Sequence, residues 1–509
     1  IDPKHLPEDP RVLQQMVLDL MAQLDREFTA RNKIEALLRE LLDARSKRKS
    51  EQLSADQLAL FAELWQARQA GKEAAAPPDD SDDDDTAAGG VSSPNKRTGG
   101  RQSLPRHLKR ERIVHDLEDS EKRCAVCQQE LRLIGEESSE RYEYIPAQLM
   151  VIEDVCKKYA CGCTVKTATK PPQPIEKSTA GASLLAQVIV AKTVDHLPLN
   201  RQQKIFERHG VDISRKTMCG WMEQCADLLQ PLYGSMKDFL FQSKVIGTDD
   251  TGVKVLDRKL PFARTGRIWP YYGDKDHPVI VDDYTATRER AGPEKFLEGY
   301  RGYLQVDAYG GYDAFFRDPA RGLIEVGCWA HARRYFHKAL ESDQSRMGPA
   351  LLLIGQLYRV EKQAQLLGPE DRLELRQLES RPILRKLHDY LLEIEEEVLP
   401  KSPEGRAVRY TLKNWTALTR YCDDGDLEID NNATERAIRG VAVGRANWTF
   451  FGSDEGGKTA AVLRTVVASC QRAQVDPFLW LKDVLSRIAT HPITRITELL
   501  PHNWAPAQV

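Results

Sequence analysis

The sequence has no run of apolar residues long enough to span a bilayer, which takes about 20 residues as a helix. Its first residues do not combine a basic segment with an apolar one, so we expect neither a membrane span nor a signal peptide. Ten cysteines among 509 residues are too few for a disulfide scaffold. At this length one hydrophobic core is not expected, and three or four domains are.

The sequence also has no excess of basic residues over acidic ones. The formal net charge is −3, which taken alone argues against a nucleic-acid partner. However, the stretch DDSDDDD at residues 79–85 holds six aspartates, and without them the charge would be +3 instead of −3. The charge is therefore segregated along the chain, and the total conceals basic regions elsewhere.

Residues 71–100 are rich in Ala, Pro, Asp, Ser and Gly and have no apolar period, which is typical of a linker. A basic segment follows at residues 95–112 and includes Arg106, Lys109 and Arg110. Flexible basic arms bind DNA phosphates by releasing counterions, and some enter the minor groove. A solvated linker is the alternative interpretation of this segment.

Residues 12–45 predict a long helix, because apolar residues recur there at alternating spacings of three and four. Glu27 and Arg31 interrupt this seam, and such interruptions can set the register and the choice of partner. The pattern favours a dimeric coiled coil. An amphipathic helix packed on its own protein is the alternative.

Half of the cysteines lie close together in the sequence. Cys124 and Cys127 form a CxxC pair, and Cys156, Cys161 and Cys163 follow. Four thiolates around one ion make a closed, structural zinc site, and small zinc modules fold around their metal. We predict a site formed by the CxxC pair with Cys161 and Cys163, and Cys156 remains an alternative ligand.

Residues 180–230 predict three helices, with a turn at Gly210 and Ser214 as the N-cap of the third. This third helix carries Arg215 and Lys216 in its first turn. Short helices joined by a glycine turn to a basic helix fit a helix-turn-helix that contacts DNA. Packing of ordinary helices is the alternative.

The pattern then changes to strands rich in Val, Ile, Thr and Tyr. They lie at residues 244–256, 266–273, 277–285, 301–312 and 322–331. Three antiparallel strands followed by strands alternating with helices predict a mixed α/β sheet. Residues 338–420 are helical by pattern and predict an insertion into this sheet domain.

Carboxylates occur at strand ends and at a helix start in this region. Asp249 and Asp250 lie in the first strand, Asp307 ends the fourth, and Glu435 opens a late helix. Three carboxylates on one sheet edge can hold two Mg²⁺ ions roughly 3.5–4 Å apart. Side-chain alternation sends Asp249 and Asp250 to opposite faces, so only one can be a ligand. Asp282 and Asp283 are further candidates, and scattered surface carboxylates are the alternative.

The stretch IDNNATERAIRG, residues 429–440, predicts a helix start with Asn431 or Asn432 as the N-cap. Glu435 lies in the first turn, and Arg439 follows one turn later. A capped, solvated helix with an i,i+4 Glu–Arg pair is the ordinary interpretation of such a stretch. A catalytic role for Glu435 is the alternative interpretation.

Several motifs occur in order along nearly the whole chain: CAVC…YIPAQL…KYACGC, TDDTGVKVL, LQVDAYGGY, GCWAHARRYF, IDNNATERAIRG…GRANWTFFGS, VDPFLWLKDVLSRIATHP and LLPHNW. With these motifs the sequence resembles the transposases of the insertion sequence 66 group, within the DDE transposases. The first acidic motif of that group usually reads Asp-Glu-Thr. Asp250 stands here in place of the Glu, at a position that is not an expected metal ligand.

The resemblance implies an RNase H-like catalytic domain in which Asp249, Asp307 and Glu435 hold two Mg²⁺ ions. It also makes Arg436 and Arg439 candidates for contact with DNA phosphates. The resemblance then favours a catalytic role for Glu435 over a solvated helix start.

Three more side chains are candidates for support of the active site. The resemblance suggests that the CxxH pair Cys328 and His331 lies near it, whereas a buried cysteine and a helix-capping histidine are the alternative. Trp448 could stack on a flipped base, although packing is the more common role of such a tryptophan.

We therefore predict a multidomain protein that mixes α+β and α/β parts. The predicted parts are a coiled-coil region (1–70), a linker and basic arm (71–112), a zinc module (113–172), a helix-turn-helix region (173–240), a catalytic domain (241–340 and 421–465), a helical insertion (341–420) and a C-terminal segment (466–509).

The predicted function is that of a DNA transposase that binds terminal repeats, cleaves them to give 3′-hydroxyls and joins these to target DNA. Its expected partners are double-stranded DNA, at least one further copy of the chain, and accessory transposition proteins. Its expected location is the bacterial cytoplasm, at the nucleoid. A DNA-binding regulator with an inert catalytic domain and an RNase H-like nuclease or resolvase are the alternative functions.

Overall fold

The structure is a computed structural model that describes residues 53, 55–73, 129, 148–160, 163, 165–170, 172–257 and 259–506. The chain divides into two units, one made of residues 1–77 and 156–509 and the other of residues 78–155. The elements below all belong to the first unit. The predicted coiled-coil segment 12–45 and the basic segment 95–112, with Arg106, Lys109 and Arg110, lie outside the described residues, as do Cys124, Cys127 and Cys161.

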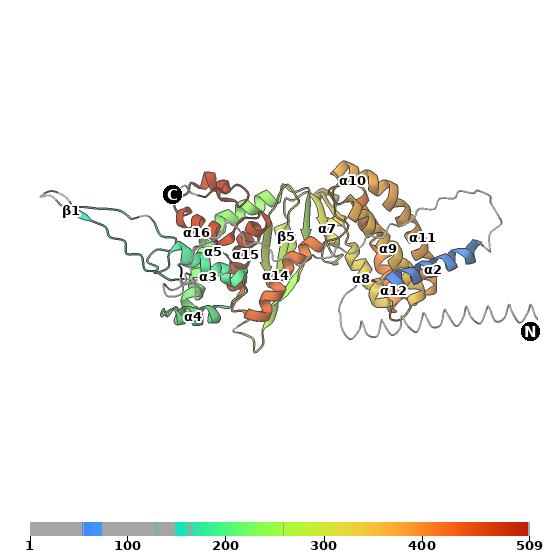
Figure 1. The fold of residues 1–509 in the computed structure, drawn as a ribbon, viewed down its shortest axis with the longest axis horizontal. Helices are drawn as coiled ribbons and strands as arrows, with labels where there is room; N and C mark the ends of the chain where they lie inside the picture. Colours follow the sequence, from blue (N-terminus) through green and yellow to red (C-terminus); the bar gives the residue numbers. More distant parts are fainter. Residues whose placement is uncertain are drawn as a thin grey trace, which may run out of the picture. The chain divides into compact units, whose positions relative to one another are not determined.

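A mixed sheet lies at the centre of the first unit (Figure 1). Its strands are β3 (Val245–Thr248), β4 (Thr251–Val255), β5 (Arg264–Tyr272), β6 (Ile280–Thr285), β7 (Gly302–Gln305), β8 (Leu323–Val326) and β9 (Phe450–Phe451). β5 is antiparallel to β3, β4 and β6, whereas β7 is parallel to β3 and β8 is parallel to β7. The predicted mixed α/β sheet is thus confirmed, with strands in each of the five predicted segments.

All four residues of β3 are buried. The strand pairs with β5 on one side and β7 on the other, so it lies in the interior of the sheet. A strand covered on both faces carries a continuous apolar run instead of an alternating one, which fits the sequence Val-Ile-Gly-Thr. This buried strand fixes the position of the residues that follow it.

Helices cover the sheet and extend the core. They include α3 (Ala182–Thr193), α4 (Leu199–Arg208), α5 (Arg215–Leu240), α15 (Asp454–Arg472) and α16 (Pro477–Arg487). α15 packs on β6 and α5, and α16 packs on α3 (Figure 1). Ser214 caps α5 as predicted, since its side chain accepts a hydrogen bond from the N–H of Thr217 at 3.1 Å. Helices α3, α4 and α5 are the three predicted for the helix-turn-helix region.

A block of helices follows β8, as predicted for the insertion. It contains α8 (Trp329–Ala339), α9 (Gln344–Ala364), α10 (Pro369–Leu375), η3 (Arg376–Ser380), α11 (Arg381–Glu397), α12 (Pro403–Lys413), α13 (Trp415–Thr419) and η4 (Arg420–Cys422). These helices share a hydrophobic core of their own with the end of the sheet. The fully buried Arg376 is held in this core by Glu361, with a guanidinium nitrogen 2.6 Å from the carboxylate.

Helix α2 (Ala55–Glu73) packs against α9. Phe61 on α2 is fully buried and lies over Gly348, where an added Cβ would come within 2.4 Å of its ring. Trp65 meets Tyr390 edge to face at 5.3 Å between ring centroids. This end of the predicted region 1–70 therefore packs on its own protein, whereas the two interpretations of the helix at 12–45 concern residues outside the described ones.

The remaining elements are short, apart from one helix that begins at residue 432. They are β1 (Lys158–Ala160), β2 (Val165–Thr167), α6 (Ala291–Phe296), α7 (Asp313–Arg317), η2 (Pro319–Arg321), α14 (Asn432–Trp448) and η5 (Ile493–Leu499). Within the described ranges, we find no helix with the length and apolar character needed to cross a membrane.

Candidate active site

Asp249 and Asp250 lie in a break between β3 and β4. The sequence predicted one continuous strand there, which is wrong at these two positions. The β5 ladder pairs with Thr248 and resumes at Thr251. The same interval of β5 contains Pro270, which has no N–H to donate to a ladder. The two side chains have different neighbours: arginines bond Asp250, whereas the charges of Asp307 and Glu435 act on Asp249.

Asp250 is neutralised by two arginines. Its side chain is 2% exposed, and its Oδ2 accepts a hydrogen bond from Arg267 Nη1 at 2.7 Å. Its Oδ1 accepts another from Arg288 Nε at 2.8 Å. Charge-assisted bonds of this kind occupy both oxygens of the carboxylate. Asp250 is therefore a link between β5 and the chain after β6.

Asp249 faces other carboxylates instead. Burial raises the pKa of Asp249 to about 7, and the negative charges of Asp307, Asp250 and Glu435 add to this effect. The backbone N–H of Asp250 acts in the opposite direction by donating to Asp249 Oδ1 at 2.6 Å. Asp307 follows β7 by two residues, and its Oδ1 accepts the N–H of Tyr309 at 3.1 Å. The fold thus brings together three carboxylates that are far apart in the sequence.

Glu435 lies in the first turn of α14, and the start of this helix packs against the end of β3. Asn431 occupies the N-cap position, but its side chain makes no capping bond, contrary to the prediction. Its Nδ2 donates instead to the carbonyl of Thr248 at 3.0 Å, because the buried strand end needs a donor. At Gly247 an added Cβ would lie 2.4 Å from Thr434 Oγ1, so only glycine permits this close approach.

Helix α8 supplies the basic neighbours of Glu435. His331 Nε2 lies 3.6 Å from Glu435 Oε1, and Arg334 Nη2 lies 3.7 Å from Oε2. The side chain of Glu435 is 28% exposed, and its Oε1 is buried without a hydrogen-bond partner in the described part of the chain. These contacts, which join α14 to another helix, differ from the solvated i,i+4 pair that the sequence also allowed.

The CxxH pair connects α8 to the same place. Cys328 is buried, and its Sγ accepts the backbone N–H of Asn431 at 3.3 Å. Burial raises the pKa of Cys328 to about 12, so the group is a neutral thiol. Burial lowers the pKa of His331, and its Nδ1 is buried without a partner among the described residues. Cys328 therefore holds the start of α14, and His331 lies next to Glu435.

The other acidic candidates lie on β6. Asp282 is fully buried and accepts a hydrogen bond from Arg464 Nε at 2.7 Å. Burial raises the pKa of Asp283 to about 6, against the opposing charges of Lys237 and Lys295. The charge of Arg464 on α15 thus neutralises Asp282. Neither Asp282 nor Asp283 is among the causes of the raised pKa of Asp249.

The donor set near Asp249 suits a hard divalent cation, but it is not a preformed cage. Grouped carboxylates repel one another, and a cation would offset that repulsion. Yet no set of three or more His, Cys, Asp and Glu residues in the described ranges is arranged to hold a metal ion. The raised pKa of Asp249 and the unpartnered Glu435 Oε1 fit the cation chemically, while the side chains would have to draw closer to bind it together.

The predicted DNA-contacting residues that are described lie at the surface. Arg215 and Lys216 are exposed in the first turn of α5, and Arg436 and Arg439 are exposed on α14. Trp448 stacks on Phe451 at 4.7 Å between ring centroids, and the ammonium of Lys192 lies 5.9 Å from its ring. Trp448 is therefore in a packed position at the end of α14.

Of the predicted zinc ligands, the structure describes Cys163, which is exposed, and the alternative Cys156, which is half-buried. Strands β1 and β2 pair antiparallel on either side of Cys163. The other predicted ligands lie outside the described residues, so the choice between these two stays a prediction.

Sequence reasoning missed several residues of this site. Gly247 could have been noticed, because a glycine inside a buried strand often marks close backbone approach. Arg267, Arg288 and Arg334 carry no such signal, since their partners are brought to them only by tertiary folding. Each of these residues holds or faces a carboxylate next to Asp249.

Comparison with known families gives four matches that together span most of the chain. The family described as "Transposase IS66 family" matches residues 177–459. The "IS66 C-terminal element" matches residues 465–502, and the "zinc-finger binding domain of transposase IS66" matches residues 121–163. The domain described as "Transposase C of IS166 homeodomain" matches residues 34–113.

The chain is also similar to curated proteins of Sinorhizobium fredii. It is 34% identical to "Uncharacterized protein y4hP" over 93% of this chain and 88% of that protein. It is 32% identical to "Uncharacterized protein y4jD" over 81% of this chain and 84% of that protein. The family match covers more than half of the chain, and the two relatives cover most of it. The chain belongs to the IS66 transposase family.

Proposed function

We propose that this protein is a DNA transposase that cleaves the ends of its element to give 3′-hydroxyls and joins them to target DNA. One observation carries the proposal: Asp249, Asp307 and Glu435, which are distant in sequence, lie close enough for the charges of the last two to raise the pKa of the first. Carboxylates are gathered in this way where a cation is to be bound.

The sheet supports an RNase H-like catalytic domain built from residues 241–340 and 421–465. Its neighbouring strands run β6, β5, β3, β7 and β8, with the first three antiparallel and the last two parallel to β3. Asp249 follows the central strand, Asp307 follows its parallel neighbour, and Glu435 comes from a helix packed on the same strand end. The helices of residues 341–420 interrupt this domain between β8 and α14.

Asp249, Asp307 and Glu435 would hold the two Mg²⁺ ions. When bound, these ions would activate water or a 3′-hydroxyl and stabilise the leaving oxygen of an in-line displacement. His331 and Arg334 orient Glu435 from α8. Asp250 fixes Arg288 beside Tyr309, since the guanidinium lies 4.0 Å from the centroid of that ring. These contacts keep the chain around Asp307 in place for the reaction.

Recognition of DNA is assigned to the parts that precede the sheet. The zinc module would be closed by Cys124, Cys127, Cys161 and Cys163, and would act with the basic arm and the exposed start of α5. The N-terminal coiled coil would pair two copies of the chain, because two element ends must be held together. Accessory proteins and a cytoplasmic, nucleoid-associated location belong to the same proposal, as do the predicted domain boundaries.

The test is metal-dependent nicking of a plasmid that carries the gene with its flanking genomic DNA, followed by joining of the cleaved 3′ end to a second DNA. Glu435→Gln removes one charge without changing the shape, and nicking should fall by about a hundredfold or more. Glu455→Gln is the matched control, because Glu455 is 69% exposed on α15 and pairs with Lys458. The control should nick at the rate of the unchanged protein.

The outcomes separate the alternatives. Binding of the flanking DNA with no nicking at all would identify a regulator with an inert catalytic domain. Cutting of branched DNA without joining of the 3′ end would identify a nuclease or resolvase. Full nicking by Glu435→Gln would show that the carboxylate has no part in the reaction.

A further inference from the structure

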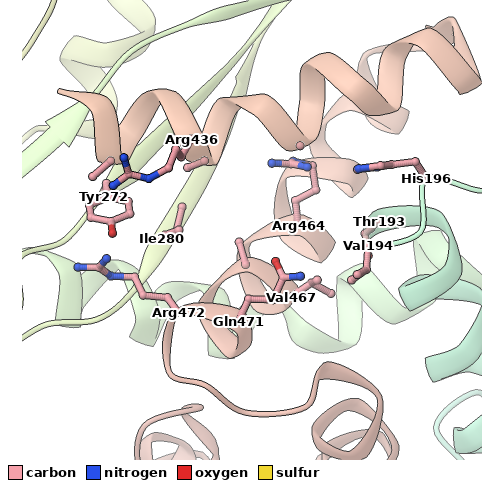
Figure 2. Close-up of a pocket in the computed structure, with 14 residues that line it drawn as sticks. Thr193, Val194, His196, Tyr272, Ile280, Arg436, Arg464, Val467, Gln471 and Arg472 are labelled. Carbon is pink, nitrogen blue, oxygen red and sulfur yellow. The ribbon is translucent and has the colours of Figure 1, made fainter. Parts of the chain in front are cut away.

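A cavity of about 470 Å³ lies beside the start of α14, and none of its lining residues is an aspartate or a glutamate (Figure 2). Its walls come from the end of α3 and the loop after it, from β5 and β6, and from α14 and α15. Arginines reach it from two helices, Arg436 from α14 and Arg464 and Arg472 from α15. Its volume falls in the range of about 300–1,000 Å³ that is typical of small-ligand sites.

The two sides of α14 carry opposite charges. Ala433, Arg436, Ala437 and Gly440 line the cavity, and their spacing of three, four and seven residues places them on one helix face. Glu435 instead contacts α8. The three small residues leave the space open, since even a Cβ added at Gly440 would meet only Arg464 at 3.6 Å.

The cavity holds more positive than negative charge. Arg464 is paired with the buried Asp282. Arg472 is largely buried, yet its bonds go to the carbonyls of Gly273 and Asp274, both at 2.7 Å, and no carboxylate pairs with it in the described ranges. Burial lowers its pKa to about 10, and its Nε is buried without a hydrogen-bond partner.

The third arginine of the cavity, Arg436, lies at its solvent-exposed edge. Arg436 is exposed and makes no ion pair with the described residues. Tyr272 also lines the cavity, and the guanidinium of Arg472 lies 3.7 Å from the centroid of its ring. A planar guanidinium that is desolvated and lacks a counter-charge is a strong binder of a phosphate, because its N–H groups match two phosphate oxygens.

On the basis of the proposed function, we propose that this cavity binds one backbone phosphate of the DNA that the protein cleaves. A duplex is too wide to enter, so a single phosphate with its sugar enters from the rim at Arg436. The cavity adjoins the cleavage site through one helix, because Arg436 follows Glu435 in the chain. A strand bound at Glu435 is therefore anchored on the other side of α14 by the three arginines.

The test measures the affinity of the full-length chain for a short duplex of arbitrary sequence, with no Mg²⁺ or other divalent metal added, so that nothing is cleaved and the zinc module keeps its ion. Arg436→Gln should weaken binding about five- to tenfold and reduce the salt slope by about one phosphate contact. Ala437→Leu fills the cavity without changing the charge and should weaken binding by a similar factor. Lys482→Gln removes an exposed charge from α16, outside the cavity, and should stay within about twofold.

A second arm separates DNA from a free phosphorylated ligand. Inorganic phosphate should raise the melting temperature of the unchanged protein and of Lys482→Gln, but not of Arg436→Gln. If Arg436→Gln loses only this response and binds the duplex normally, the site takes a free phosphate and the inference about DNA is wrong. If both cavity variants behave as the unchanged protein in both arms, the cavity binds no phosphate.

These results do not depend on catalysis. A protein that fails to nick or join DNA but loses duplex affinity on filling the cavity would overturn the proposed function and leave the cavity as a site for a DNA phosphate. If the protein nicks DNA normally and its cavity variants bind the duplex as tightly as the unchanged protein, the proposed function stands and this inference is wrong.

Discussion

The two sides of helix α14 differ in charge and in how that charge is balanced. On one side Glu435 joins Asp249 and Asp307, and His331 and Arg334 are the basic groups that approach Glu435. On the other side three arginines surround a cavity with one paired carboxylate, Asp282. The first side has an excess of negative charge, and the second side has an excess of positive charge.

Charges so close would neutralise each other if their side chains could meet, and the helix backbone keeps them apart. Residues next to each other on a helix point about 100° apart, so Glu435 and Arg436 face different neighbours. The first side is suited to a cation and the second to a phosphate. A transposase needs both at one DNA strand, and one rigid helix supplies both at a fixed separation.

The largest effect is expected from moving α14 as a whole. Gly247→Ala places a Cβ 2.4 Å from Thr434 Oγ1, so the helix start must shift away from β3. A displacement of about 1 Å can cost a hundredfold in rate, and we expect a loss of nicking of this order. Nicking rate and the free energy of unfolding are the measurements, and the latter should fall by about 1–3 kcal/mol.

Gly234→Ala is the matched control for that change, because nothing lies within 4 Å of a Cβ added there on α5. It should leave nicking unchanged and stabilise the helix by about 0.5–1 kcal/mol. Equal nicking by both variants would show that the close contact of α14 with β3 does not position Glu435.

The next largest effect is expected at Asp250, where both carboxylate oxygens accept hydrogen bonds from arginines. Asp250→Asn removes the charge that Arg267 and Arg288 share, and both arginines are then left near the sheet without it. We expect the free energy of unfolding to fall by about 1–3 kcal/mol, since the arginines are partly exposed and water can compensate in part. Asp257→Asn, at a half-exposed position paired loosely with Arg264 at 3.7 Å, should change it by about 0.5 kcal/mol or less.

Asp283 is a half-buried carboxylate outside both sites, and its substitution should have the opposite effect on stability. Its pKa is about 6 in the folded protein against an ordinary value of 3.8, so folding favours the protonated form. The free energy of unfolding therefore falls as the pH rises from about 4 to 6. Asp283→Asn removes this loss and should stabilise the protein at pH 7.5 by about 1–3 kcal/mol, but hardly at pH 4.

Denaturant unfolding at the two pH values measures this difference. Asp276→Asn, an exposed change in the turn before β6, is the control and should show the same stability as the unchanged protein at both. A loss of stability in Asp283→Asn at pH 7.5 would mean that the ammonium groups of Lys237 and Lys295 outweigh the cost of burial.

The smallest effect is expected at the helix start. Asn431→Ala removes the hydrogen bond to the Thr248 carbonyl and leaves that carbonyl without this donor. The free energy of unfolding should fall by about 1 kcal/mol, while nicking falls only slightly, because Gly247 still permits the close approach. Asn447→Ala, near the other end of α14, should be neutral to denaturant unfolding. A neutral Asn431→Ala would remove this residue from the account of how α14 is held.

The sequence predicted the strands, the helical block and the cap at Ser214, because these depend on local periodicity and on one side chain near its own backbone. It did not predict the break at Asp249, since this break is a property of the pairing of two strands. The capping role expected for Asn431 was wrong for a related reason: a buried strand end competes for the same amide.

The residues of the candidate site likewise include some that the sequence predicted and some that it did not. The three carboxylates and His331 could be chosen from ordered motifs, whereas the arginines that pair with Asp250 come from segments whose spacing with these acids is not regular. The arginine cavity was not visible in the sequence at all. Arg436 was expected to contact phosphate, but Arg464 and Arg472 join it only because α15 packs beside α14 and β6.

The most direct test of the central claim is a titration of the full-length chain with Mn²⁺, followed by electron paramagnetic resonance of the free ion. If Asp249, Asp307 and Glu435 together hold the metal, the unchanged protein binds Mn²⁺, and Asp249→Asn and Glu435→Gln each weaken that binding by at least about tenfold. Asp276→Asn should leave it unchanged. Equal Mn²⁺ affinity in all four proteins would contradict a shared metal site at these carboxylates.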